Sequence, residues 1–113
     1  MARTTQSTHQ LTQAQARHIW LRAQRLTTRT PFGEGPGAVA AAVAHLGYVQ
    51  IDTINVIERC HHHILWTRIP GYRREDLQRA QSVDKSVFEY WTHALSYVAT
   101  QDMRYFVNAM KRR

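Results

Sequence analysis

The sequence predicts a mainly α fold with a small β component, a winged-helix variant of the helix-turn-helix with a short β-hairpin wing. Apolar residues recur at helical spacing in several stretches, and two β-prone runs lie close together near residues 88–98. The order of these elements is helix, helix, short strand, helix and hairpin, which is typical of a winged helix. The 113 residues supply one hydrophobic core, so we expect a flexible tail over residues 1–10 and one unit over residues 11–113.

The first helix is predicted to begin after Thr12, which with Gln15 has the pattern of a capping box. Apolar residues then recur on one face until the helix fades near Leu26; they are Ala16, Ile19, Trp20 and Ala23. Residues 27–37 form a loop, because they hold two prolines and three glycines.

A second helix is predicted from Pro36 to Leu46, with Gly47 ending it. Residues 48–51 are β-prone and short, which favours a strand. A third helix is expected to start after Asp52 or Thr53, both good N-caps, and to continue to Trp66.

The break at Pro70-Gly71 separates this part from a short charged helix over residues 73–81. Residues 88–91 and 95–98 are expected to pair as the hairpin. A last helix opens at Thr100 or Gln101 with one apolar face, formed by Met103, Phe106, Val107 and Met110. Two interpretations stay open: this helix folds back on the same core, or the chain is the first winged-helix unit of a longer, multi-unit protein.

Composition excludes several classes of protein. Cys60 is the only cysteine, so a disulfide-stabilised secreted scaffold is excluded. Residues 1–10 are polar, unlike a signal peptide, and the longest apolar run, residues 38–44, is far shorter than the ~20 residues that span a membrane. We therefore expect a cytoplasmic protein that does not use a membrane. The 15 Lys and Arg against 8 Asp and Glu, a net charge of +7, point to a polyanionic partner, with nucleic acid first and an anionic membrane second.

The most informative residues are Gln50 and Asp52. If residues 49–52 are extended, side chains alternate, so Val49 and Ile51 face the core while Gln50 and Asp52 share a polar face. An amide and a carboxylate then lie together where a strand meets a helix. The alternative is structural: Asp52 caps the next helix and Gln50 is solvated.

Basic side chains in the second half are natural phosphate contacts, with a solvated basic surface as the alternative for each. The predicted DNA-binding residues are Arg59, His61, His62, Arg68, Arg73 and Arg74. Cys60 and His63 share a helical face, but two ligands do not close a zinc site, so we predict no metal and place Cys60 in the core. Most aromatic side chains of this half are expected in core and hairpin packing rather than in base stacking; they are Trp66, Tyr72, Phe88, Tyr90, Trp91 and Tyr97.

Several of these runs resemble the bacterial winged-helix DNA glycosylases of the YcaQ type, which unhook interstrand crosslinks. The resemblance covers most of residues 11–113 and rests above all on residues 46–59 (LGYVQIDTINVIER) and residues 88–94 (FEYWTHA) in combination. It implies a glutamine–apolar–aspartate catalytic motif at Gln50, Ile51 and Asp52, acting on double-stranded DNA that carries N7-alkylated or crosslinked guanine. It also implies no metal, no organic cofactor and several tandem winged-helix units with a β-barrel-like part.

Two other interpretations stay open. A non-catalytic winged-helix DNA-binding protein, such as a transcription regulator, explains the charge and the fold equally well, but not a carboxylate where negative charge opposes phosphate binding. The second interpretation is a truncated remnant that folds poorly. For the glycosylase we expect a nucleoid-associated monomer.

Overall fold

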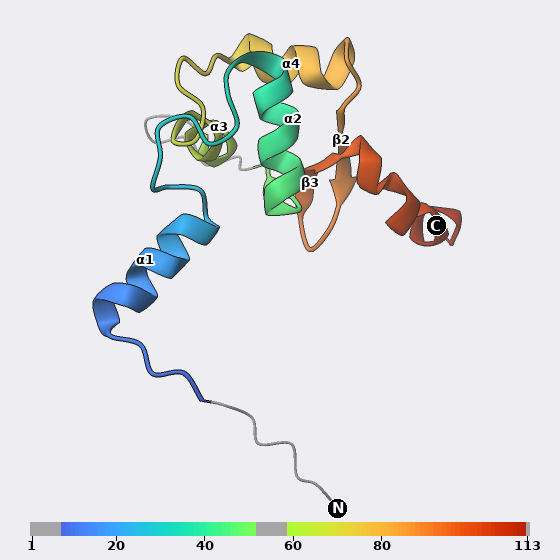
Figure 1. Cartoon of the computed structure of the whole chain (residues 1–113). Coiled ribbons are helices and arrows are strands. Elements are labelled where there is room, and N and C mark those ends of the chain that lie inside the picture. The colour runs from blue at the N-terminus through green and yellow to red at the C-terminus, as the bar shows by residue number, and fades with distance from the viewer. Residues whose placement is uncertain (1–7, 52–58, 113) are drawn as a thin grey trace, which may run out of the picture.

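The computed structural model describes residues 8–51 and 59–112, and Figure 1 shows the path of the chain. Helices dominate, and a small antiparallel sheet lies beside them, as the sequence predicts. The elements in chain order are α1 (Gln13–Ala23), α2 (Gly35–Leu46), β1 (Val49–Gln50), α3 (Cys60–Trp66), α4 (Arg74–Ser82), β2 (Val87–Trp91), β3 (Leu95–Ala99), the 3-10 helix η1 (Thr100–Tyr105) and α5 (Val107–Lys111).

The sheet has three strands in the order β1-β3-β2, and both pairs are antiparallel. The predicted hairpin is confirmed, since β2 and β3 pair from Val87 opposite Ala99 to Trp91 opposite Leu95. β1 joins the other edge of β3 with Val49 opposite Tyr97 and Gln50 opposite Ser96. Residues that are more than forty positions apart in the chain therefore lie next to one another at the turn end of the hairpin.

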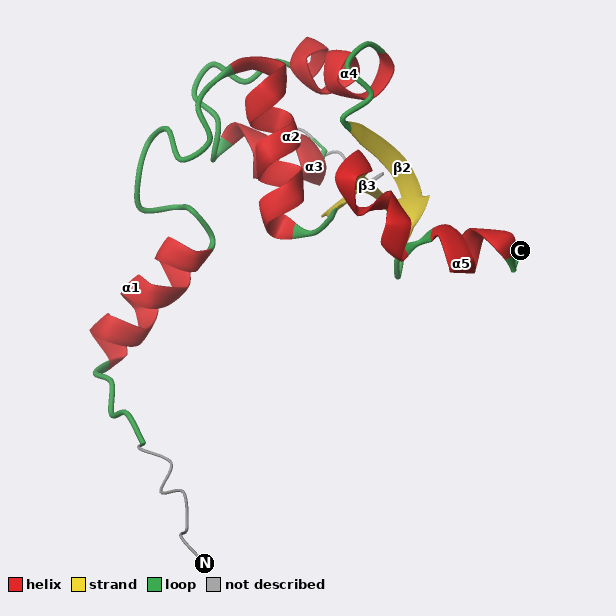
Figure 2. Cartoon of the chain, turned by 45° about the vertical axis from the view of Figure 1, so that its right-hand side comes forward, coloured by secondary structure: helices red, strands yellow, loops and turns green. Residues whose placement is uncertain are grey.

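The hydrophobic core is formed by side chains from α2, α3, α4 and the sheet, and Figure 2 shows how these elements are grouped. It consists mainly of alanine and branched aliphatic side chains that the helical and strand periodicities bring to the same interior. Fully buried members from different elements include Val39, Val43, Leu65, Ala80 and Val87. Within the described residues, no helix is both long enough and apolar enough to cross a membrane.

α1 begins as predicted but does not pack as its pattern suggests. The Thr12 hydroxyl accepts from the Gln15 amide and the Gln15 side chain accepts from the Thr12 amide, so the capping box is confirmed. The helix ends at Ala23, before the expected Leu26. Both cartoon views place α1 apart from the other helices, and Trp20 is 70% exposed (Figures 1 and 2). The apolar face of α1 is therefore not covered by the described residues of this chain.

Two side chains from the body of the fold hold the end of α1. His45 Nε2 lies 2.9 Å from the carbonyl oxygen of Ala23, and Arg68 Nε donates to the carbonyl oxygen of Gln24 at 2.9 Å. The last carbonyls of a helix have no partner within it, and basic side chains favour that end electrostatically. α1 is thus attached through its C-terminal cap.

The second and third helices follow the prediction to different degrees. α2 starts one residue before the predicted Pro36 and ends at Leu46, and Gly47 has a φ of 87°, the positive value that favours glycine after a helix. The expected continuous helix from Asp52 or Thr53 to Trp66 is wrong, because Arg59 has an extended backbone with ψ 144° and α3 begins only at Cys60. The start proposed at Asp52 or Thr53 lies outside the described residues.

The sequence predicts one continuous helix at the C-terminal end, but this segment is a 3-10 helix followed by a short α-helix. It touches the hairpin through Phe106, whose ring centroid lies 5.2 Å from that of Tyr90. Phe106 is only half-buried, so the segment lies against the outer side of the hairpin and adds little to the main core.

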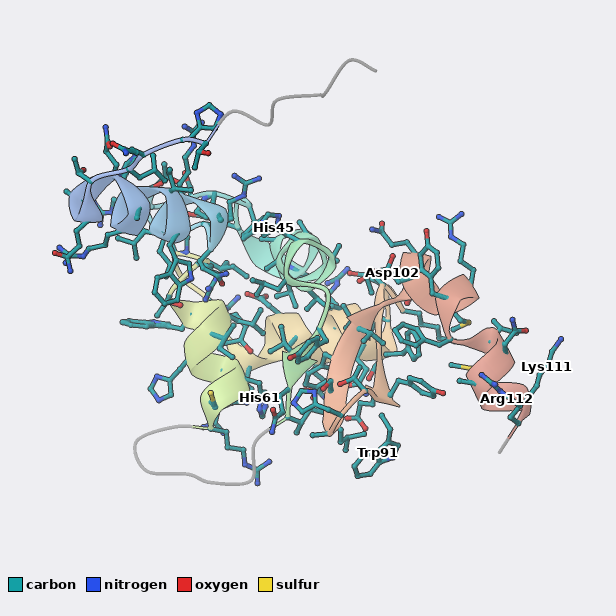
Figure 3. All side chains as sticks on the ribbon, turned by 90° about the horizontal axis from the view of Figure 1, so that it is seen from below. His45, His61, Trp91, Asp102, Lys111 and Arg112 are labelled. Atoms are coloured by element: carbon teal, nitrogen blue, oxygen red, sulfur yellow. The ribbon has the colours of Figure 1, made fainter. Side chains whose placement is uncertain are left out.

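The prediction that the aromatic residues pack inside is only partly right. Tyr97 is buried, whereas Trp66 is 64% exposed and Trp91 is 54% exposed. Trp91 is the last residue of β2, and Figure 3 shows its side chain pointing away from the strands. Tryptophan at these two places faces solvent because α3 and the hairpin each have only one side turned toward the core.

Candidate functional site

Gln50 is positioned by the pleat of β1. Val49 is 1% exposed and points into the core, so Gln50, the next residue, is exposed on the other side. Beyond it, the Ile51 amide donates to the Leu95 carbonyl at 2.9 Å, and the Ile51 side chain packs on the core. The predicted alternation therefore holds over residues 49–51. Asp52, its predicted partner, lies outside the described residues.

The Gln50 side chain meets a histidine that the sequence interpretation left without a role. His93 Nε2 lies 3.1 Å from Gln50 Oε1. The ring of Tyr48 lies edge-on to the imidazole of His93, with centroids 5.2 Å apart and an interplanar angle of 73°. Tyr48 and Gln50 share one face of the extended segment, and His93 from the turn between β2 and β3 lies against both. Gln50 and His93 are 43 positions apart, which hides this contact from any local pattern, and only the strand register reveals it.

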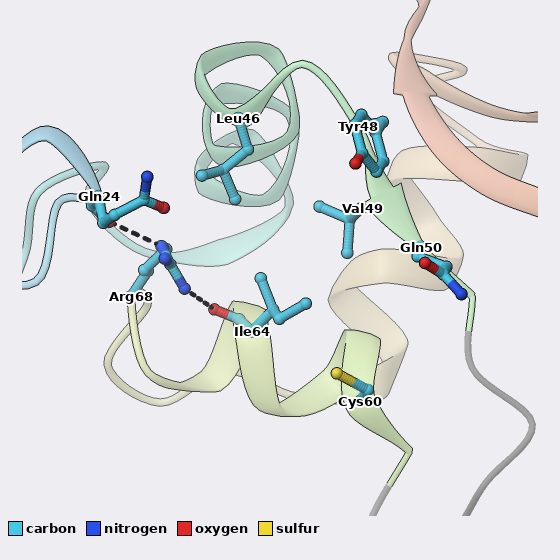
Figure 4. A pocket seen from close by; sticks show the side chains of 8 residues that line it. All are labelled: Gln24, Leu46, Tyr48, Val49, Gln50, Cys60, Ile64 and Arg68. Carbon is cyan, nitrogen blue, oxygen red and sulfur yellow. Dashed lines mark hydrogen bonds between the residues drawn. The ribbon is translucent and has the colours of Figure 1, made fainter. Parts of the chain in front are cut away.

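Beside Gln50 is a pocket of about 380 Å³ between α2, β1 and α3, shown in Figure 4. Leu46, Val49 and Ile64 form its apolar wall, and Gln50 lies at its edge. The full lining is Gln24, Leu46, Tyr48, Val49, Gln50, Cys60, Ile64 and Arg68.

Arg68 belongs to this pocket as a structural residue. Its side chain is 7% exposed, its Nε donates to the Gln24 carbonyl, and its Nη1 donates to the Ile64 carbonyl at 3.0 Å (Figure 4). Burial lowers the pKa of this guanidinium from its ordinary value. The predicted phosphate contact of Arg68 therefore finds no support, because the side chain is buried and its Nε and Nη1 donate to oxygens of this chain.

His61 is also not placed for the predicted DNA contact. It is 3% exposed, with its ring centroid 4.1 Å from that of His62 and 5.7 Å from that of Tyr97. Cys60, expected in the core, is instead exposed. Both corrections follow from which side of α3 is buried: His61 and Leu65 face the interior, whereas Cys60 is the exposed first residue of the helix.

Of the remaining basic candidates, the arginines are exposed and His62 is half-buried. Arg73 and Arg74 are exposed and line a second pocket of about 490 Å³ together with His62, Trp66 and Tyr72. His62 Nδ1 lies 2.7 Å from the Tyr72 hydroxyl, which fixes one wall of this pocket. At about 100° per helical residue, His62 and Trp66 fall on the side of α3 opposite Cys60 and Ile64. α3 therefore separates this basic pocket from the pocket beside Gln50.

Arg59 is exposed immediately before α3, and it influences a buried tyrosine. Burial and the negative charge of Glu89 raise the pKa of Tyr97, while the Arg59 guanidinium opposes that rise. The positive charge of Arg59 therefore interacts with a residue of β3, the strand that pairs with β1 at Gln50. Among the described residues, no group of three or more His, Cys, Asp or Glu could hold a metal ion.

The site therefore combines an exposed amide, a histidine in contact with it, and exposed arginines on the surrounding surface. Such an arrangement can bind a polyanion and orient a small polar group beside it. A comparison with protein families gives a match over residues 43–113 to the family described as DNA glycosylase AlkZ-like. No solved structure matches the chain significantly.

Proposed function

Because the chain belongs to the AlkZ-like DNA glycosylase family, we propose that it cleaves the N-glycosidic bond of N7-alkylguanine and unhooks interstrand crosslinks in double-stranded DNA. The family match includes β1, the hairpin and the lining of both described pockets except Gln24. The observation that carries the proposal is Gln50, an exposed amide held on a strand whose neighbouring residue, Val49, anchors it in the core.

The element order supports a winged-helix arrangement for DNA binding. α2, β1, α3, α4 and the β2–β3 hairpin follow one another as helix, strand, two helices and wing, and the sheet order β1-β3-β2 suits that arrangement. In this scheme α4 is the helix that approaches the DNA groove. Arg73 and Arg74 lie at its start and would contact phosphates.

The proposed chemistry needs little acid catalysis. N7-alkylguanine is cationic and already a good leaving group, so the enzyme has mainly to stabilise the oxocarbenium-like sugar and orient water. We assign to the Asp52 carboxylate the stabilisation of the sugar and the orientation or deprotonation of the attacking water, and to the Gln50 amide the positioning of that water by a hydrogen bond. A crosslinked base cannot swing into a deep pocket as flipped bases do, and an exposed site accepts it in place.

The direct test measures base release from double-stranded DNA containing N7-methylguanine. We expect the wild-type protein to release the base, and Gln50→Ala and Asp52→Asn to lower the rate by about 10²-fold or more. Gln101→Ala, which removes an exposed amide from η1, is the matched control and should behave as wild type. Undiminished activity in either site variant would remove that residue from the mechanism.

A DNA-binding experiment separates the glycosylase from a non-catalytic binder. Both should bind DNA more weakly as the salt concentration rises. Arg73→Ala should reduce the slope of log K against log[salt] by about one. Tight binding without base release from any alkylated duplex would favour the non-catalytic DNA-binding protein.

A further inference from the structure

We propose that His93 is a positioning residue for Gln50, one that fixes which end of the Gln50 amide faces the damaged nucleotide. This inference rests on the proposed function for its catalytic consequence. Its structural content, a hydrogen bond between His93 and Gln50 with a defined donor, stands on the geometry alone.

The strand register creates the contact. β1 pairs with β3 at the turn end of the hairpin, with Gln50 opposite Ser96 and the Ile51 amide bonded to the Leu95 carbonyl. The turn residue His93 is therefore carried next to the exposed side of β1, where its Nε2 meets Gln50 Oε1 at 3.1 Å. His93 is itself exposed, so core packing does not account for its position.

The chemistry of the two groups assigns the donor. An amide oxygen only accepts hydrogen bonds, so the imidazole must carry a hydrogen on Nε2. In the neutral ring Nδ1 is then an acceptor, and it lies 3.4 Å from the Thr92 hydroxyl. Thr92 Oγ1 is in turn 3.1 Å from Ser96 Oγ. Both hydroxyls also donate to the Ala94 carbonyl, Thr92 Oγ1 at 3.3 Å and Ser96 Oγ at 3.1 Å, so the donor at Nε2 is assigned by the contact to Gln50 alone.

Two further features keep the imidazole in place. The edge-on ring of Tyr48 limits rotation of the imidazole, since the two rings are 5.2 Å apart. Protonation of His93 leaves the Nε2 hydrogen in position, because imidazolium donates from both nitrogens. The contact to Gln50 is therefore maintained whether or not His93 is charged.

The consequence for the reaction concerns the orientation of the amide. An unrestrained glutamine exchanges its oxygen and its NH2 group by rotating about χ3. With Oε1 held by His93, the NH2 group is the end left for the substrate side. Gln50 then binds an acceptor atom at the lesion, such as a sugar oxygen or the oxygen of the attacking water, and it does so without losing rotational freedom in the transition state.

The structural half of the proposal is tested by long-range ¹H–¹⁵N NMR spectra of the imidazole ring of His93 in the DNA-free protein. We expect the neutral tautomer protonated at Nε2, with its ¹⁵N shift altered by Gln50→Ala. A ring protonated at Nδ1 would mean that the amide is reversed and donates to the histidine, which would overturn the proposal.

The functional half is tested by single-turnover base release from N7-methylguanine DNA. His93→Ala should slow the chemical step about tenfold and leave the DNA Kd unchanged, and His93→Gln, which keeps a donor near the Nε2 position, should recover part of the rate. In the Gln50→Ala background, His93→Ala should cause no further loss, because the two residues act as one unit. His18→Ala, which removes an exposed histidine from α1, is the matched control.

The outcomes separate this inference from the proposed function. Additive losses in the double variant, or an unchanged rate in His93→Ala, would refute positioning by His93 while base release itself persists. If the wild-type protein releases no base, the proposed function fails, and the tautomer measurement still decides the contact.

Discussion

Replacing Arg68 by alanine should destabilise the protein by about 3 kcal/mol. The guanidinium makes two well-formed bonds to backbone oxygens, Nε to Gln24 at 2.9 Å and Nη1 to Ile64 at 3.0 Å. A hydrogen bond to a charged group contributes about 1.5–3 kcal/mol. The pocket of about 380 Å³ beside Arg68 admits water to the freed carbonyls, so the lower end of that range applies to each bond.

Urea denaturation measures this loss. With an m value of about 1.5 kcal/mol per molar for a chain of this size, the midpoint should fall by about 2 M. Arg68→Lys keeps the charge but lacks the planar fork, so it should lose roughly half as much. Arg17→Ala removes an exposed arginine from α1 and should stay within about 0.5 kcal/mol of wild type.

A result in which Arg68→Ala and Arg17→Ala have equal midpoints would refute the reasoning, because the loss would then come from charge alone. Hydrogen exchange adds an independent check. Because Arg68 holds the end of α1 through the Gln24 carbonyl, amides in the last turn of α1 should exchange faster in Arg68→Ala.

Three further predictions concern the core, a helix end and pH. Leu65→Ala should cost about 2–5 kcal/mol in thermal or chemical unfolding, since Leu65 is 0% exposed; a smaller loss would mean that the site collapses around the cavity. Gly47→Ala should cost about 1 kcal/mol through its φ of 87° alone, because an added Cβ meets no atom within 4 Å. The pKa of Tyr97 is raised, so its contribution to stability is full below pH 10.0 and is lost at more alkaline pH. Melting curves from pH 8 to 11 should show this loss in wild type and not in Tyr97→Phe.

Local sequence rules were sufficient where the neighbours that decide a structure are a few residues away. The capping box at Thr12 and Gln15, the glycine end of α2 and the hairpin all follow from such rules, and all are present. The exposure of Gln50 follows in the same way from period-two alternation, once residues 48–51 are recognised as extended.

The same rules failed where burial depends on packing between distant elements. Helical spacing marks an apolar face on α1, yet it cannot say whether another element covers that face, and Trp20 is 70% exposed. Basic side chains suggested phosphate binding at both Arg68 and Arg73. Tertiary structure buries Arg68 against two carbonyls and leaves Arg73 on the surface. The DNA contacts of the exposed residues stay predictions.

By itself, the sequence determined the places of α1, α2, β1, α4 and the hairpin, the excess of positive charge, and the amide that β1 presents to solvent. Only the tertiary structure decided that His93 meets that amide and that α3 divides the surface into two pockets. The physical reason is the range of the interactions. Backbone propensities and side-chain periodicity act over a few residues, whereas a hydrogen bond between groups 43 positions apart forms only once the strands have paired in one register.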